Sequence, residues 1–289
     1  MRWVLALGIV GSTCTPAVGP VARGVLPPVV AESSGLVASA RLPGVFWTHN
    51  DSGDVPRLFA VDGAGGLLGE IAVDGAEAVD WEAITRDDAG NLWIADLGNN
   101  RSSRTDLTLY RVPEPAPEAG RVAADRVVRV AYPEQTAFPD PGLAFDCEAV
   151  WWEAGTLWLA TKHRKDTRTV LYRVDGLEGA GSLTRVAELD VGGADHPFGG
   201  QVTDADLHPS GRWLALLTYH AVLVLERAPG EEGFGRVVHT VELDGDVTGQ
   251  CEAVAWDGWS LVFTNEGRGV FRIDDPFRAD SFPPATEAP

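Results

Sequence analysis

Three short stretches of the chain place a carboxylate just before a small residue and an apolar one. They read VDWEAI at 79–84, FDCEAV at 145–150 and GQCEAV at 249–254. In each stretch the glutamate is followed by a run rich in apolar residues that is typical of a buried strand, so it would lie at the start of that strand. Carboxylates repeated in this way could converge on a divalent cation or act as general acids and bases.

The elements that must position these carboxylates are pairs of strands, and the same pattern occurs five times. Each unit has an apolar strand, a turn and a second apolar strand that ends in polar residues. The turns contain Pro-Gly, Ala-Gly, Ala-Gly, Ser-Gly and Asp-Gly, which are residue types of hairpins. Most units continue with two further strand-like runs, and no segment shows sustained helical periodicity. Four antiparallel strands repeated around a ring are the blades of a β-propeller.

We therefore predict an all-β, five-bladed β-propeller in a single domain at 25–277, with six blades if the long second unit hides another. The fifth unit lacks an outer strand. The segment VLPPVV at 25–30 precedes the first blade and could supply that strand, closing the ring. Its two prolines suit an edge strand, where the missing N–H removes no ladder hydrogen bond. The tryptophans of the strands are expected to pack between blades.

The first strand of each propeller blade lines the central channel, so the repeated acids should meet near the axis. Alignment of the five units gives one residue per blade: Ser34, Glu82, Glu148, Asp204 and Glu252. In the fourth blade Thr203 could take this place instead of Asp204. Buried carboxylates without partners are costly, and a hard cation with oxygen ligands compensates them directly. We predict a calcium ion held by these residues; the alternative is that the acids accept backbone N–H groups or pair with arginines.

Polar side chains close the second strand of every unit and should lie on the same face as the acids, because the two strands are antiparallel. Four of them could hold or protonate an anionic group: Lys162, His163, Arg164 and His220. The sequence has no G-x-S-x-G motif, no zinc-binding triad and no Walker loop. Catalytic residues are thus candidates only, and no organic cofactor is predicted.

The composition restricts the partners. Over 289 residues there are 42 acidic and 23 basic residues, a net charge of −19. Nucleic acid is an unsuitable partner, because its phosphates require a basic surface. A bound cation suits this charge. Once Cys14 is removed with a leader, Cys147 and Cys251 remain; they could form a disulfide after export or stay as two buried thiols.

The N-terminus reads as a secretory signal over residues 1–19. One arginine precedes an apolar run at 3–10, and small residues then lead to a cleavage site after Gly19. Alternatively, the signal is that of a lipoprotein and ends at Cys14. No other apolar run approaches the roughly 18 residues that a membrane span needs. We expect an exported protein, extracellular or periplasmic, free or lipid-anchored, with a Pro-rich tail at 278–289.

The segment ESSGL followed by FWTHNDSGDVPRLFAVDGAGG resembles the opening of the SdiA-regulated and phytase-esterase-like secreted propellers. That family typically carries an E-x-SGL entry and an N-D-x-G turn, and DWEAI, LWIADLGNN and LYRVPEP extend the match over most of 32–115. A more distant similarity is to the calcium-activated apyrases, five-bladed propellers with one Ser or Glu per blade around a central calcium. Asp204 departs from the serine expected in the fourth blade. The resemblance implies a metal site more than nucleotidase activity.

Two functions are compatible with these observations. The first is a binding module of the cell envelope, which docks a small molecule, a glycan or an envelope protein on the face of the acid ring. The alternative is a calcium-dependent phosphoesterase or esterase-like hydrolase. A metal that is purely structural, or a lactonase of the gluconolactonase type, would also fit the fold, but the lactonase needs an Asn and an Asp around the metal that the alignment does not place. The fold alone does not decide between them. We expect a monomer.

Overall fold

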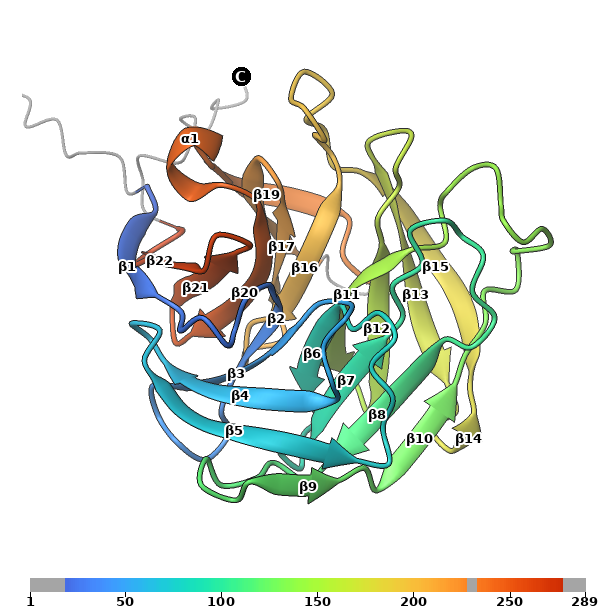
Figure 1. Ribbon diagram of the computed structural model, residues 1–289. Helices are drawn as coiled ribbons and strands as arrows, with labels where there is room; N and C mark the ends of the chain where they lie inside the picture. Colours follow the sequence, from blue (N-terminus) through green and yellow to red (C-terminus); the bar gives the residue numbers. More distant parts are fainter. Residues whose placement is uncertain (1–18, 228–232, 278–289) are drawn as a thin grey trace, which may run out of the picture.

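The computed structural model describes residues 19–227 and 233–277. Five sheets surround a central axis, as Figure 1 shows. This arrangement confirms the five-bladed β-propeller, and no sixth blade lies within the second unit. One helical turn, α1 (Gly245–Thr248), joins the fourth blade to the fifth.

The blades are named here in chain order, with their strands from the axis outward. Blade 1 has β2 (Ser33–Ala38), β3 (Val45–Asn50), β4 (Arg57–Asp62), β5 (Leu67–Asp74) and β9 (Arg121–Ala123). Blade 2 has β6 (Ala83–Arg86), β7 (Leu92–Asp96), β8 (Thr108–Val112), β10 (Arg126–Arg129) and β14 (Gly179–Ala180). Blade 3 has β11 (Cys147–Glu153), β12 (Thr156–Thr161), β13 (Arg168–Asp175) and β15 (Ser182–Asp190). Blade 4 has β16 (Val202–Leu207), β17 (Trp213–Thr218), β18 (Ala221–Glu226) and β19 (Arg236–Glu242). Blade 5 has β20 (Cys251–Asp257), β21 (Ser260–Asn265), β22 (Gly269–Ile273) and β1 (Val21–Val25).

The long second unit adds a strand to blade 1 instead of forming a new blade. Its segment β9 pairs in parallel with β5 at the edge of blade 1. In the same way, β14 from the third unit pairs in parallel with β10 of blade 2. Each added strand covers an edge that would otherwise present unpaired N–H and C=O groups.

The N-terminal segment closes the ring, as predicted, but with other residues. Strand β1 (Val21–Val25) pairs antiparallel with β22, and Val21 lies opposite Arg272. The predicted segment 25–30 instead turns inward after β1, because Leu26 and Val30 are buried between blades 5 and 1. The two prolines lie in that turn and not in a strand.

The hydrophobic core consists of five clusters, one between each pair of adjacent blades. Trp47 and Trp81 belong to the cluster between blades 1 and 2, Trp93 packs between blades 2 and 3, and Trp151 packs between blades 3 and 4. All four indole side chains are fully buried. Packing between faces of adjacent sheets holds the inner strands in a closed ring, which is what brings their first residues together.

Some predictions concern residues at the limits of the described chain. The leader up to residue 18, with Cys14, and the tail at 278–289 lie outside the described residues. Cys147 and Cys251 are free and buried, so they are two thiols and form no disulfide. Among the described residues, no helix has both the length and the apolar character needed to cross a membrane.

Candidate functional site

A bulge lies at the start of the inner strand in blades 1, 3, 4 and 5, whereas in blade 2 Glu82 directly precedes β6. The antiparallel ladder skips Glu148 between Cys147 and Ala149, and it skips Glu252 in the same way in blade 5. In blade 1 the ladder shifts between Ser33 and Leu36, which frees Ser34. A bulged residue is left out of the ladder, so it can direct its side chain away from the sheet face.

In blade 4 the bulged residue is Thr203 and not Asp204. The ladder skips from Val202 to Asp204, so Thr203 holds the place of the glutamates. Its hydroxyl donates to the Cys251 carbonyl at 2.8 Å. A hydroxyl here is closer to the serine that the resemblance to the calcium-activated apyrases implies.

Asp204 has a different, structural role. Its carboxylate accepts the N–H groups of Ala205 at 2.8 Å and Val254 at 2.7 Å. The first oxygen is thus bound to its own strand and the second to blade 5. Burial raises the pKa of Asp204 well above its usual range, although the N–H groups of Val254, Ala205 and Leu36 oppose that rise. Asp204 therefore links the inner strands of blades 4 and 5. Thr203, the alternative for the fourth blade, holds the position equivalent to the glutamates.

The three glutamates of the predicted ring act on one another electrostatically. Burial and then the charge of Glu148 raise the pKa of Glu82 well above its usual range. Burial also raises the pKa of Glu148 well above its usual range, and the charge of Glu252 adds to that rise. Burial raises the pKa of Glu252 to about 7 against the opposing effect of Lys162. The three carboxyl groups therefore share one electrostatic environment near the axis.

A lysine lies on one side of this ring. Lys162 Nζ is 3.1 Å from Glu148 Oε2, and both side chains are buried. The same ammonium donates to the Tyr219 hydroxyl at 2.9 Å, and both Lys162 and Tyr219 lower the pKa of Glu252. Arg164 lies 3.6 Å from Glu148 Oε1 and 2.8 Å from Asp146. Glu148 and Glu252 thus have cationic neighbours within the protein.

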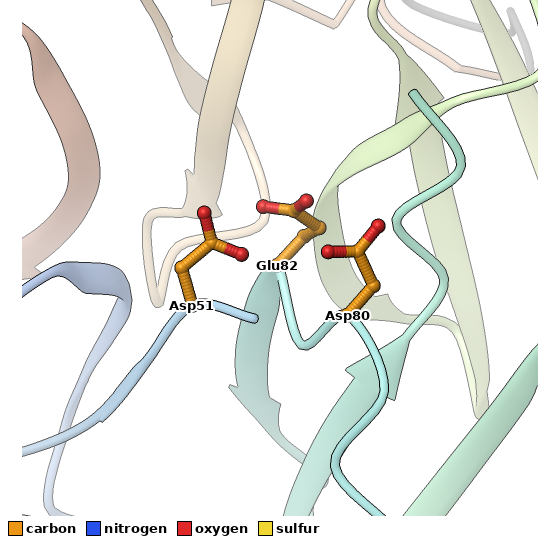
Figure 2. A group of neighbouring side chains, drawn as sticks. All are labelled: Asp51, Asp80 and Glu82. Atoms are coloured by element: carbon orange, nitrogen blue, oxygen red, sulfur yellow. The ribbon is translucent and has the colours of Figure 1, made fainter. Parts of the chain in front are cut away.

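The other side of the ring holds a cluster of three carboxylates. Asp51, Asp80 and Glu82 each place one oxygen within 4.8 Å of the other two. Figure 2 shows their side chains pointing toward one another. Ser34 donates its hydroxyl to Glu82 Oε2 at 3.0 Å. Among the described residues, no lysine or arginine forms an ion pair with any of the three; the neighbouring Arg104 pairs with Asp96. We call these three residues the acid triad.

Local sequence explains how the acid triad forms. Asp51 directly follows β3, whereas Asp80 and Glu82 precede β6. The backbone of Gly98 lies against this pair, since a Cβ there would be 2.5 Å from Glu82 Oε1 and 2.6 Å from Asp80 Oδ2. Burial and the charge of Asp51 raise the pKa of Asp80 to about 6.

Of the acid triad, the prediction for the metal site included Glu82 alone. Asp51 belongs to the polar ends of second strands, which do lie beside the ring: its N–H donates to the Glu32 carbonyl just ahead of β2. Asp80 was missed. The signal was available in VDWEAI, because residues two apart in an extended segment share a face, and Asp80 and Glu82 are two apart.

The two candidate histidines make contacts of their own. His163 Nδ1 is 3.0 Å from Asp166, on the loop that follows it. His220 Nδ1 is 3.1 Å from the Thr218 hydroxyl, and its ring stacks on His196 at 4.8 Å. Burial lowers the pKa of His220. Of the four catalytic candidates, Lys162 and Arg164 therefore contact ring carboxylates, whereas the structure gives the histidines other partners.

A cavity of about 430 Å³ lies beside the ring. Tyr219 and Gln250 line it, together with Phe198, His196 and His220. Phe198 is exposed, and its ring lies 6.2 Å from that of Tyr219. Because Tyr219 also contacts Lys162, a ligand in this cavity would touch a residue that contacts the lysine beside the ring.

The site contains donors suited to a hard cation. The acid triad offers carboxylate oxygens, and Ser34 adds a hydroxyl next to them. In addition, Glu148 Oε1 is buried and accepts no hydrogen bond. Such oxygen-only sets match calcium, which accepts six to eight oxygens and tolerates irregular geometry. The residues present therefore fit a calcium ion.

Comparison with known proteins gives distant likenesses. No protein-family model matches the sequence, and no curated protein sequence matches it. A virginiamycin B lyase structure from Staphylococcus aureus is 13% identical, with 86% of this chain and 68% of that chain covered and a TM-score of 0.42. A putative 6-phosphogluconolactonase from Bacteroides uniformis is 14% identical, with 83% and 65% covered and a TM-score of 0.43. A putative gluconolactonase gives 14% identity, 83% and 73% coverage and a TM-score of 0.43. Similarity at this level carries no information on ligand or activity.

Proposed function

We propose that this protein is an exported β-propeller that binds calcium at the acid triad and uses the face around the ion to bind a ligand. The ligand is a small molecule, a glycan or another protein of the cell envelope. The observation that carries the proposal is the convergence of three carboxylates without an ion pair, next to a ring whose other acids have cationic neighbours. Calcium would complete the charge balance of the ring.

The charge argument rests on the difference between the two sides of the ring. Glu148 has Lys162 at 3.1 Å, and Asp146 has Arg164 at 2.8 Å. Among the described residues, Asp80 and Glu82 have no lysine or arginine at ion-pair distance, and burial and neighbouring acids disfavour their charged forms. A bound divalent cation would lower both pKa values and convert mutual repulsion into shared attraction.

Calcium is preferred over other metals because of the donor set. Magnesium requires a near-regular octahedron of oxygens and gives up its water reluctantly. Zinc favours imidazole and thiolate ligands. Among the described residues, the cluster of ligand atoms within 4.8 Å of one another consists of carboxylates alone, with no histidine and no cysteine.

The second candidate function is a calcium-dependent phosphoesterase or esterase-like hydrolase. The presence of Lys162 and Arg164 beside the ring favours it, since cationic side chains could stabilise an anionic transition state. Calcium would supply Lewis-acid polarisation when bound. Both cations already pair with carboxylates of the protein, however, so the binding module remains the preferred function.

Thermal melting in EDTA and in calcium tests the cation site. At a calcium concentration about 100 times Kd, the stabilisation should be about 2.7 kcal/mol. Asp80→Asn should abolish it, whereas Asp195→Asn, an exposed acid on a loop before an inner strand, should leave it intact. A melting temperature that is the same in EDTA and in calcium would refute the proposal.

A separate assay distinguishes the two functions once calcium binding is shown. The substrates are p-nitrophenyl phosphate and p-nitrophenyl acetate, each with calcium present. Turnover that disappears in Arg164→Gln, with the circular dichroism spectrum unchanged, would establish a hydrolase. No turnover of either ester, together with calcium binding, supports the binding module.

A further inference from the structure

A second cavity lies at the opposite end of the propeller axis from the acid triad. Its volume is about 370 Å³, and residues from the ends of all five inner strands, or just beyond them, line it. They include Ala38 from β2, Arg86 from β6, Trp152 from β11, Asp206 from β16 and Trp256 from β20. The volume lies in the range of small-molecule sites. We call this cavity the far pocket.

Two acids of the far pocket, one buried and one half-buried, already have partners. Asp87 accepts hydrogen bonds from the Asn91 backbone and side chain and from Trp93 Nε1. Glu153 accepts from Trp151 Nε1 at 3.1 Å and pairs with Arg227. These carboxylates therefore hold turns and neighbouring strands and are not free to bind a ligand.

Asp206 is committed in the same way. Its Oδ2 accepts the Trp256 N–H at 2.8 Å, which ties β16 to β20. Burial raises its pKa to about 6, and Arg86 is among the groups that oppose the rise. Arg86 and Asp206 both line the far pocket.

Arg86 differs from the acids of the far pocket in its contacts. Within the described part of the chain it makes no side-chain hydrogen bond and no ion pair, although it is half-buried. Other half-buried arginines of this protein, such as Arg57 and Arg104, form ion pairs with neighbouring carboxylates. A guanidinium in a concave site presents a planar fork of donors that matches a carboxylate in two parallel hydrogen bonds.

We propose that the far pocket binds a small monocarboxylate with an apolar body, whose carboxylate pairs with Arg86 and whose body lies against Trp152 and Trp256. The two indoles supply the apolar walls. A single negative charge suits the site better than a phosphate dianion, because Asp88 and Asp206 also line it. This proposal is independent of the calcium site, which lies at the other end of the inner strands.

Titration with benzoate, followed by tryptophan fluorescence and calorimetry in EDTA, tests the proposal. Benzoate should bind saturably, and its neutral analogue benzamide should bind about tenfold or more weakly, because it lacks the charge-assisted hydrogen bonds. Arg86→Gln should weaken benzoate to the same extent. The matched control Arg121→Gln, at an exposed arginine on β9, should leave the affinity unchanged.

A second variant tests the cavity without changing charge. Ala38→Leu should fill part of the far pocket and also weaken benzoate, while Arg86 remains. The proposal is overturned if benzoate does not saturate, if Arg86→Gln binds it as well as the parent protein does, or if inorganic phosphate binds more tightly than benzoate. EDTA is present throughout, so failure here is separate from failure of the calcium site.

Discussion

Replacing Lys162 by methionine should destabilise the fold strongly when calcium is absent. Methionine keeps the length and the apolar stem of lysine but removes the charge. The ammonium is 3.1 Å from Glu148, with 4% of the Lys162 side chain and 3% of the Glu148 side chain exposed. Removing one partner of such a pair leaves a buried carboxylate whose main compensating charge is gone, with Arg164 3.6 Å away.

The magnitude follows from the burial of the pair. Removal of one partner of a buried ion pair costs about 3–5 kcal/mol, whereas replacing both partners by neutral groups is often close to neutral. Lys162→Met should therefore cost about 3–5 kcal/mol, and Lys162→Met combined with Glu148→Gln should cost much less. The cost of the single variant should shrink toward pH 5, because Glu148, whose pKa is already raised, can then take up a proton.

Urea denaturation in EDTA at pH 7.5, monitored by tryptophan fluorescence, measures these values. A double-mutant cycle, completed by Glu148→Gln alone, isolates the interaction between Lys162 and Glu148. The contact of Lys162 with Tyr219 is lost in both Lys162→Met and the double variant, so its loss cancels. A single variant that costs less than about 1 kcal/mol, or a double variant that costs the sum of the two singles, would refute the assigned charge balance.

Three further predictions use the same stability and binding assays. Burial raises the pKa of Asp80 to about 6 and that of Glu252 to about 7, so the folded protein binds protons more tightly at these groups than the unfolded chain does. In EDTA, the stability of the fold should therefore fall as the pH rises from 5 to about 8. A melting temperature that stays constant or rises over this range would contradict the prediction. Asp204→Ala should cost about 1–3 kcal/mol for each backbone N–H left without an acceptor, while calcium affinity stays unchanged; a lost calcium signal in a folded variant would restore Asp204 as a ligand. Gly98→Ala should weaken calcium binding because its Cβ would be 2.5 Å from Glu82 Oε1; unchanged affinity by calorimetry would mean that Glu82 is not a ligand.

The five blades could be predicted because each repeat consists of strand-forming and turn-forming residues whose preferences depend mainly on their neighbours in the sequence. Apolar alternation and glycine turns specify each hairpin without reference to the rest of the chain. The closing strand was harder to place, since both 21–25 and 25–30 are apolar enough for an edge. Leu26 and Val30 are buried between blades 5 and 1, so residues 21–25 and not 25–30 form the closing strand. That burial exists only once the ring has assembled.

The placement of Glu82, Glu148 and Glu252 at the starts of inner strands could also be predicted, because the pattern repeats from blade to blade. The choice between Thr203 and Asp204 could not. A bulge adds one residue to a strand without changing its apolar pattern, and the ladder alone shows which residue was skipped.

The sequence did not allow us to predict which charged side chains pair with one another. Lys162 and Asp80 are both polar residues next to inner-strand or second-strand ends, yet one neutralises Glu148 and the other adds to the charge around Glu82. Which acids are compensated depends on side-chain positions across different blades. The division of the ring into a lysine side and the acid triad is therefore a property of the folded protein.

A crystal structure of the protein grown with calcium tests the central claim most directly. We expect an ion at the acid triad, with oxygens of Asp51, Asp80 and Glu82 at about 2.3–2.6 Å. Lys162 should remain paired with Glu148 in the same crystal. A structure in which no ion is bound and a carboxyl oxygen of Asp80 lies within hydrogen-bond distance of one of Glu82 would contradict the account.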